Sequence, residues 1–210
     1  NDMKSFRQLD SKTPGHPEFG HTDGVDATTG PLGQGIAQAV GMAIAEEYLA
    51  KNFNTDYYEV FDHYTYALTS DGDLQEGVSY EAMSLAGHLG LSKLILLYDS
   101  NDYQLDGAVD DAYSDDLRLR CLSMKWNHIL VRDGENRNAI SKAISKAKRS
   151  DRPTIIEIKT ILGHGTTMSN SSDTHGAPIG DKEREIAAKF FNYDKAPFVI
   201  CKEAKATFAN

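Results

Sequence analysis

The sequence predicts an α/β fold in which helices cover both faces of a mostly parallel sheet. Three observations support this: short β-prone runs alternate with helical periodicity, one of these runs is apolar throughout, and Gly- and Asp-rich turns separate the segments. Alternating strands and helices produce right-handed crossovers between parallel strands. A continuous apolar run is typical of a parallel strand that is buried on both faces.

Periodicity and turn residues divide the chain into its expected elements. Ile36, Val40 and Ile44 are spaced by four, as on one face of a helix, and the run Leu94–Tyr98 has the composition of a buried strand. In chain order we expect an extended loop at 1–31, a helix at 32–51, a strand at 65–69, a helix that Glu76–Gly77 opens and Gly90 closes, a strand at 94–98, a helix at 110–122, a strand at 128–131, a helix at 136–148, a strand at 154–159, a loop at 163–180 and a short helix at 181–191.

Length and composition fit one globular domain. The chain has 210 residues, of which 40% are hydrophobic and 25% charged, so it can bury a sizeable core. Residues 1–210 are therefore interpreted as a single domain. The stretches 1–31 and 163–180 are rich in Gly, Thr and His, and long ordered loops of this kind often carry function in compact domains.

The charge balance is acidic, with a formal net charge of −9 and a sequence pI of about 5.2. An acidic surface repels nucleic-acid phosphates, which argues against nucleic acid as a partner. A cofactor that carries phosphate would have to be met by a metal ion or by backbone N–H groups, because the total charge does not favour it.

Cysteine use and hydropathy favour a cytoplasmic protein without a membrane partner. Cys121 and Cys201 are far apart and are read as reduced thiols. No apolar run approaches the roughly 18 residues that span a bilayer. Residues 1–6 lack the apolar core of a signal peptide. Because the first residue is Asn, we expect either that something upstream was removed or that the chain is a piece of a longer protein.

Two polar residues, Asp71 and Asn101, each follow a β-prone run, and one expected helix lies between them. Adjacent parallel strands would bring both side chains to the same end of the sheet, where ligands of such sheets bind. A carboxylate and an amide oxygen are hard ligands suited to Mg²⁺ or Ca²⁺, and phosphates complete the coordination of Mg²⁺.

The residues after Asp71 would favour an anion. Gly72 lets a phosphate approach the backbone without meeting a Cβ, and the helix that Glu76–Gly77 opens offers free N–H groups. Asp-Gly and Asn-Asp are also common turns at strand ends, so each alone could be purely structural. Their pairing at this spacing favours a metal–phosphate site, although spacing does not separate it from other Mg²⁺–phosphate folds.

The segment from Asp71–Gly77 to Asn101 resembles the thiamine diphosphate motif, which begins Gly-Asp-Gly and ends with a metal-binding Asn at a similar distance. Ser70 stands where the motif has its first Gly. The resemblance implies thiamine diphosphate as the cofactor, held through Mg²⁺ (or Ca²⁺) by Asp71, Asn101 and the backbone carbonyl of Tyr103.

Narrower blocks resemble the transketolase family. They are Thr13–Glu18, Gly24–Gly35 and Thr174–Gly180, with the stretches 62–69 and 80–106 in the same order. The resemblance runs from Asp2 to about Pro197. Residues 169–172 depart from the family pattern, since Ser-Asn-Ser-Ser stands where a second His is common.

The transketolase resemblance implies roles for particular residues. Gly30 and Leu32 would lie against the cofactor, as would Gly72. His16 would bind the donor sugar, and His175 would lie near the diphosphate and the reacting carbons as a proton donor or acceptor. Glu76 would lie in a subunit interface near the cofactor. The other histidines have no comparable support and are expected to be structural.

The implied reaction transfers a two-carbon ketol unit from a ketose phosphate to an aldose phosphate, as in the pentose phosphate pathway. The loops 1–31 and 163–180 would then be active-site loops of the diphosphate-binding domain. The family's pyrimidine-binding domain, with its activating glutamate, is absent from the sequence. The resemblance therefore implies a complementary domain or subunit as partner, in a homo- or hetero-oligomer, and a chain that is incomplete alone.

Two alternatives stay open. A non-catalytic binding or interaction module of the same fold would explain Ser70 and the altered residues 169–172. Another thiamine diphosphate enzyme, such as deoxyxylulose phosphate synthase or a ketoacid dehydrogenase subunit, would share the metal motif. The blocks around His16 and Gly30–Gly35 argue against such an enzyme.

Overall fold

The computed structural model describes residues 2–193 and 196–209, and their contacts gather into two units. The sheet unit comprises Pro31–His164 and Met168–Pro178, and the terminal unit comprises the described residues of Asn1–Gly30, Gly165–Thr167 and Ile179–Asn210. The interpretation of residues 1–210 as one domain with two active-site loops stays a prediction.

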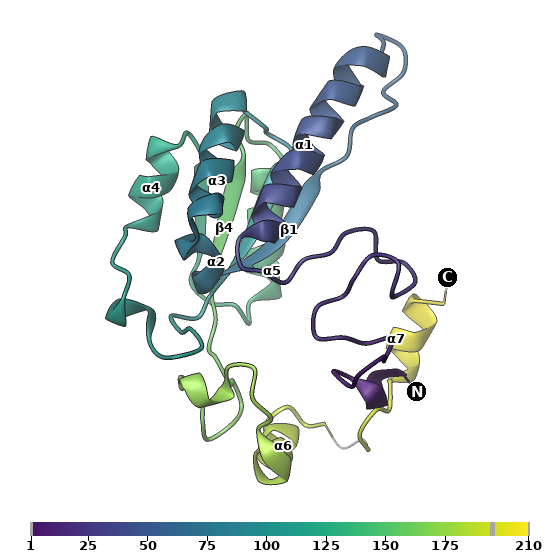
Figure 1. Cartoon of the computed structure of the whole chain (residues 1–210), viewed down its shortest axis with the longest axis vertical. Coiled ribbons are helices and arrows are strands. Elements are labelled where there is room, and N and C mark those ends of the chain that lie inside the picture. The colour runs from purple at the N-terminus through teal and green to yellow at the C-terminus, as the bar shows by residue number, and fades with distance from the viewer. Residues whose placement is uncertain (1, 194–195, 210) are drawn as a thin grey trace. The chain divides into compact units, whose positions relative to one another are not determined.

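The sheet unit contains four parallel strands in the order β1-β2-β4-β3, which confirms the predicted fold class (Figure 1). The strands are β1 (Thr65–Ser70), β2 (Leu94–Ser100), β3 (Asn127–Val131) and β4 (Thr154–Lys159). Ser70 pairs with Asp99 and Ser100 pairs with Lys159, so the carboxyl ends of β1, β2 and β4 lie side by side. Each expected strand is present, extended by one or two residues at most.

Helices cover both faces of this sheet. Five α-helices belong to the unit: α1 (Gln34–Phe53), α2 (Asp71–Gln75), α3 (Gly77–Leu89), α4 (Leu117–Ser123) and α5 (Arg137–Ala147). Residues of α1, α3 and α4 share one core with Leu94, Leu96 and Ile155, whereas α5 packs with Ile95 and Ile156 on the opposite face. Successive residues of β2 and β4 thus alternate between two cores, as strands do. This explains why the run at β2 is apolar throughout.

Two expectations differ from the structure. The helix expected at 110–122 is divided into a 3-10 turn, η2 (Val109–Asp111), and α4, because Asp116 accepts the N–H of Leu119 and caps a new helix start. The Asp-Gly sequence that follows β1, a common turn at strand ends, is instead the start of α2, with Ser70 as its N-cap. The Asp73 carboxylate accepts both the N–H and the hydroxyl of Ser70, at 2.9 Å each, and so fixes this helix start.

The terminal unit is less regular and contains η1 (Asp2–Ser5), α6 (Gly180–Phe190) and α7 (Lys202–Thr207). Phe190 and Phe191 make an edge-to-face contact with ring centroids 5.0 Å apart. Glu183, on α6, accepts the N–H and hydroxyl of Thr167, which fastens this helix to the loop before it. The sequence analysis anticipated α6 but not α7. The helices among the described residues are all too short or too polar to span a membrane.

Candidate functional site: the carboxyl end of the sheet

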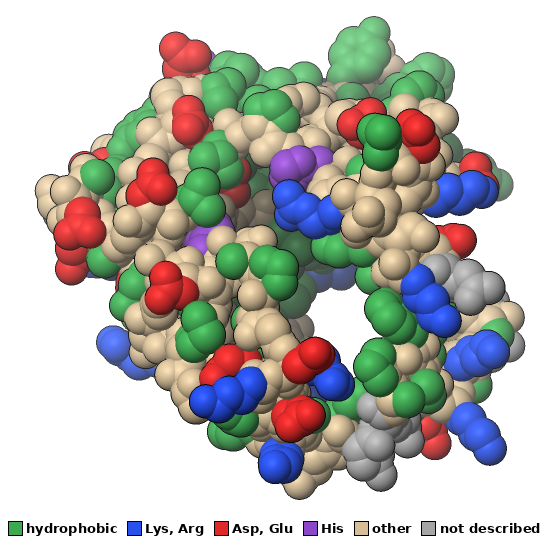
Figure 2. Space-filling model, turned by 60° about the horizontal axis from the view of Figure 1, so that its bottom comes forward, with side chains coloured by type: hydrophobic (Ala, Val, Ile, Leu, Met, Phe, Trp, Pro, Cys, Tyr) green, Lys and Arg blue, Asp and Glu red, His purple; other side chains and the backbone are tan. Residues whose placement is uncertain are grey.

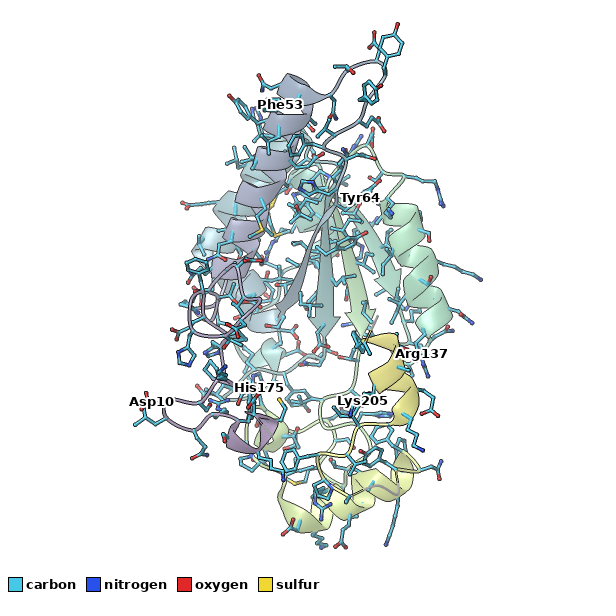
Figure 3. All side chains as sticks on the ribbon, turned by 90° about the vertical axis from the view of Figure 1, so that its right-hand side faces the viewer. Asp10, Phe53, Tyr64, Arg137, His175 and Lys205 are labelled. Atoms are coloured by element: carbon cyan, nitrogen blue, oxygen red, sulfur yellow. The ribbon has the colours of Figure 1, made fainter. Side chains whose placement is uncertain are left out.

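The ends of β1 and β2 bring Asp71 and Asn101 together, as the sequence predicts. The backbone N–H of Asn101 donates to Oδ2 of Asp71 at 3.3 Å. His175, from the loop that follows η3 (Ser172–Thr174), lies beyond the tips of the strand arrows, whereas Tyr64 lies at the opposite end (Figure 3). The polar groups therefore gather where parallel α/β sheets bind their ligands.

Asp71 is a buried acid with two hydrogen-bond donors but no ion-pair partner among the described residues. Its side chain is 4% exposed, and Oδ1 accepts the hydroxyl of Tyr98 at 2.5 Å. None of the lysines, arginines and histidines that the structure describes forms an ion pair with it. Burial raises the pKa of Asp71, and the Tyr98 hydroxyl opposes that shift only in part. A cation bound at this carboxylate would remove the cost of burying its charge.

The loop after β2 presents amide and carbonyl oxygens beside Asp71. Oδ1 of Asn101 accepts the N–H of Tyr103 at 3.0 Å, and Nδ2 lies 3.4 Å from Oδ2 of Asp99. Tyr103 is paired with Ala108 through an isolated bridge, which closes the loop. Among the described residues no three His, Cys, Asp or Glu side chains cluster as a metal site. A cation here would take one carboxylate with amide, carbonyl and non-protein oxygens, a set typical of Mg²⁺.

A pocket of about 620 Å³ within the sheet unit collects five of the predicted site residues: Leu32, Gly72, Asn101, Tyr103 and His175. A Cβ on Gly72 would lie 3.3 Å from the Leu32 side chain, so a larger residue would crowd the pocket wall. Nδ1 of His175 is buried and has no hydrogen-bond partner among the described residues. Buried polar atoms are normally paired, so this nitrogen is available to a ligand.

Asp71 itself borders a neighbouring hollow of about 470 Å³ together with Tyr98, Ser100 and Lys159. Its carboxylate therefore lies between this hollow and the Asn101 loop that it bonds. The two predicted ligand side chains share one end of the sheet, and they approach it from adjacent strands.

Asp73 links the starts of α1 and α2 beside the site through hydrogen bonds, a role that was not predicted from the sequence. Besides Ser70, its carboxylate accepts the N–H of Gly33 at 2.9 Å, which joins the start of α1 to the start of α2. Gly33 has φ 78° and a Cβ there would lie 2.7 Å from Oγ of Ser79, so only glycine fits. Ser70 is extended, with φ −130°, a conformation that needs no glycine. The departure from the thiamine diphosphate motif is therefore accommodated.

Besides Asp71, three predicted site residues lie outside the pocket. Glu76 is exposed between α2 and α3. His16 and Gly30 belong to the terminal unit, where His16 is exposed and a Cβ on Gly30 would lie 3.0 Å from its ring. Gly30 has φ 144°, so its close approach to His16 depends on glycine.

The sequence analysis also missed Tyr98 and Lys159 as contributors to the site. Tyr98 stands inside the motif, three residues before Asn101, and its apolar neighbours in β2 suggested only a core position. Lys159 is the last residue of β4, a strand the motif does not contain. A polar side chain at the end of each buried strand was the signal available for both.

Taken together, the parallel sheet, the buried carboxylate at its carboxyl end and the pocket beside it define an α/β protein built to bind an anionic cofactor. Comparison with known proteins agrees. The family model described as transketolase, thiamine diphosphate binding domain, matches residues 1–210.

Curated relatives include a transketolase from Streptococcus pyogenes, 53% identical over 99% of this chain, and one from Staphylococcus aureus, 51% identical over the whole chain. A solved transketolase from Leishmania mexicana is 43% identical, with a TM-score of 0.94 over 99% of this chain. The chain belongs to the transketolase family and corresponds to its thiamine diphosphate binding domain. It spans 29% and 32% of the two curated relatives and 32% of the solved structure.

Proposed function

We propose that this chain is the diphosphate- and metal-binding part of a cytoplasmic transketolase of the pentose phosphate pathway. It would act with a complementary pyrimidine-binding domain or subunit in a homo- or hetero-oligomer. The substrates would be a ketose phosphate donor and an aldose phosphate acceptor, and the reaction moves a two-carbon ketol unit between them. The observation that carries this proposal is the buried carboxylate of Asp71, which forms no ion pair among the described residues, beside Asn101.

In the proposed site, Asp71, the side-chain oxygen of Asn101 and the carbonyl of Tyr103 hold Mg²⁺ (or Ca²⁺). The metal's charge balances Asp71 and the diphosphate, which an acidic chain would otherwise repel. Supporting this assignment, the loop from Asn101 to Tyr103 is folded on itself by the hydrogen bond between these two residues.

Other residues would position the cofactor and the sugar. Gly72 admits the diphosphate to the backbone, and Leu32 and Gly30 lie against the ring system. Glu76, which is exposed, would meet a second subunit near the cofactor. Bound thiamine diphosphate supplies the nucleophilic carbon and the electron sink for cleaving a bond next to a carbonyl.

His175 and His16 would handle protons and orient the substrate. Nδ1 of His175 has no hydrogen-bond partner in the described part of the chain, so this imidazole at the pocket wall can donate to, or accept from, a group that enters the pocket. His16 would hydrogen-bond the carbonyl and hydroxyl end of the donor. Binding and orienting the sugar in this way aligns the reacting bond before cleavage.

A reconstitution assay tests the proposal. The chain is mixed with a complementary pyrimidine-domain chain, Mg²⁺ and thiamine diphosphate, and transfer from xylulose 5-phosphate to ribose 5-phosphate is measured. Transfer in the mixture, and not in either chain alone, is the expected result. Cofactor binding in calorimetry without any transfer would instead support the non-catalytic module. A different product would support another thiamine diphosphate enzyme.

A further inference from the structure

The last residue of β4, Lys159, contacts the loop that carries the proposed metal ligands. Lys159 pairs in register with Ser100, and its Nζ lies 2.8 Å from Oγ of Ser100 and 2.9 Å from Oδ1 of Asp102. Ser100 and Asp102 are the residues on either side of Asn101. One side chain from a neighbouring strand therefore holds both neighbours of the proposed ligand.

The next residue, Thr160, adds to this attachment. Its N–H donates to the carbonyl of Ser100 at 3.2 Å, and its hydroxyl donates to the carboxylate of Asp99. The end of β4 thus bonds three of the four residues from Asp99 to Asp102. The position of Asn101 is fixed from outside the thiamine diphosphate motif.

Lys159 also contacts Glu157, two residues earlier in β4. Oε1 of Glu157 lies 3.4 Å from its Nζ, and Oε2 of Glu157 accepts the imidazole N–H of His128 at 2.7 Å. Glu157 is 14% exposed, whereas the Lys159 side chain is 39% exposed. Glu157 thus contacts the ammonium group from the sheet, and the ammonium group reaches Ser100 and Asp102 in the loop.

Asp102 is the residue that needs such support. Its φ is 65°, in the left-handed region that non-glycine residues seldom occupy without compensation. Its carboxylate, 69% exposed, lies 2.9 Å from Nζ of Lys159. If Asp102 relaxed to an ordinary backbone angle, the chain would turn differently between Asn101 and Tyr103, and the two ligand oxygens would separate.

We infer that Lys159 is a positioning residue that keeps Asn101 and the Tyr103 carbonyl in place for the metal by holding Asp102 in its left-handed conformation. This inference rests on the proposed function and adds to it a residue from a third strand. Charge alone predicts the opposite effect, because removing a cation next to a bound dication should tighten metal binding. The sign of the change therefore separates positioning from simple electrostatics.

The first test compares Lys159→Met with Lys142→Met, which removes the same charge from an exposed position on α5. Free Mn²⁺ is measured by electron paramagnetic resonance in the assembled enzyme, this chain with its pyrimidine-binding part, at a fixed concentration of thiamine diphosphate. We expect the Mn²⁺ dissociation constant to rise about 10-fold in Lys159→Met, as for loss of an outer-sphere partner, and to stay unchanged in Lys142→Met. Unchanged or tighter binding in Lys159→Met would overturn the inference.

A second pair of variants removes the charge of the exposed Asp102 in two ways and does not depend on Lys159 being replaceable. Asp102→Ala removes the ion pair while the left-handed φ stays unfavourable, so the loop should relax and Mn²⁺ binding should weaken about as much as in Lys159→Met. Asp102→Gly adopts the same φ without strain and should bind like the wild type. Equal affinities for the alanine and glycine variants would refute the conformational role. Absence of Mn²⁺ binding in the wild type would refute the proposed function instead.

Discussion

The two ends of the parallel sheet each have a buried carboxylate, but only the one at the amino end forms an ion pair among the described residues. Before β2, at the amino end, Nζ of Lys93 lies 2.8 Å from Oε1 of Glu46 and 2.7 Å from Asp62, so the 2%-exposed Glu46 carboxylate has a cation beside it. After β1, at the carboxyl end, Asp71 is almost as deeply buried and has no ion pair among the described residues. One buried acid has an ion-pair partner within the chain, and the other is the carboxylate that we propose binds a metal ion.

This difference assigns stability to one end and binding to the other. An ionised carboxylate that is buried without a counter-charge costs stability, and such groups concentrate where a ligand compensates them. The amino end should therefore respond to substitution through the free energy of unfolding, and the carboxyl end through affinity. The following predictions test that division.

The largest effect is expected for Asp71→Asn. Loss of the carboxylate should weaken metal-dependent binding of thiamine diphosphate by more than the roughly 100-fold that loss of an outer-sphere partner causes. Because burial raises the pKa of Asp71, the neutral side chain should also make the unliganded chain more stable, not less. Calorimetry of binding and thermal unfolding without cofactor measure the two effects. Undiminished cofactor retention would argue strongly against Asp71 as a ligand.

At the amino end, Lys93→Met should lower the free energy of unfolding by about 3 kcal/mol, because it leaves the buried Glu46 carboxylate unpaired. Urea denaturation measures this. Lys51→Met is the matched control, since its pair with Glu47 is exposed and should contribute only about 0.5 kcal/mol. Cofactor affinity should be unchanged in both variants. A large loss of affinity in Lys93→Met would contradict the expectation that the amino end affects stability and not binding.

Gly33→Ala should destabilise the fold by about 2 kcal/mol through left-handed strain, with the Ser79 contact adding to it. Because Gly33 bonds Asp73, cofactor affinity should fall as well. Gly41→Ala provides a control of opposite sign. It lies inside α1 with open space around its Cα, so alanine should stabilise the helix by about 0.5–1 kcal/mol. Equal thermal midpoints for the two variants would contradict this reading.

The smallest effect concerns alkaline pH. Hydrogen bonds to Asp62 and Glu46 outweigh the effect of burial and raise the pKa of Lys93 to about 12. A raised lysine pKa contributes stability that is fully present below the unfolded value, near 10.5, and is lost as pH rises through about 12. The wild type should lose stability across this range more steeply than Lys93→Met. Parallel curves would indicate that the Lys93 pair contributes nothing there.

Sequence reasoning predicted the strands and the pairing of Asp71 with Asn101 because both follow from local patterns. The alternation of apolar runs and helices predicted a parallel sheet, although not its strand order, and a spacing of one strand–helix–strand unit brought two residues to one edge. It did not anticipate α2 or the break near Asp116. Those depend on single side-chain caps, from Asp73 and Asp116, that override the surrounding helix pattern.

The contacts that Lys159 and Tyr98 make at the site could not be predicted from the sequence either. Lys159 is far from Asn101 in sequence and acts through a left-handed backbone angle at Asp102, which no periodicity reveals. Likewise, the hydrogen bond from Tyr98 to Asp71 depends on which face of β2 the ring takes. Such features require the register between strands, and register is a property of the folded sheet.

One divalent cation is proposed to join the ends of β1 and β2 to a diphosphate. An anomalous-scattering crystal structure of the assembled enzyme with Mn²⁺ and thiamine diphosphate tests this directly. We expect a manganese peak in contact with the Asp71 carboxylate, the Asn101 side-chain oxygen and the Tyr103 carbonyl. A peak elsewhere, or a diphosphate bound with Asp71 still bonded only to Tyr98 and Asn101, would contradict it.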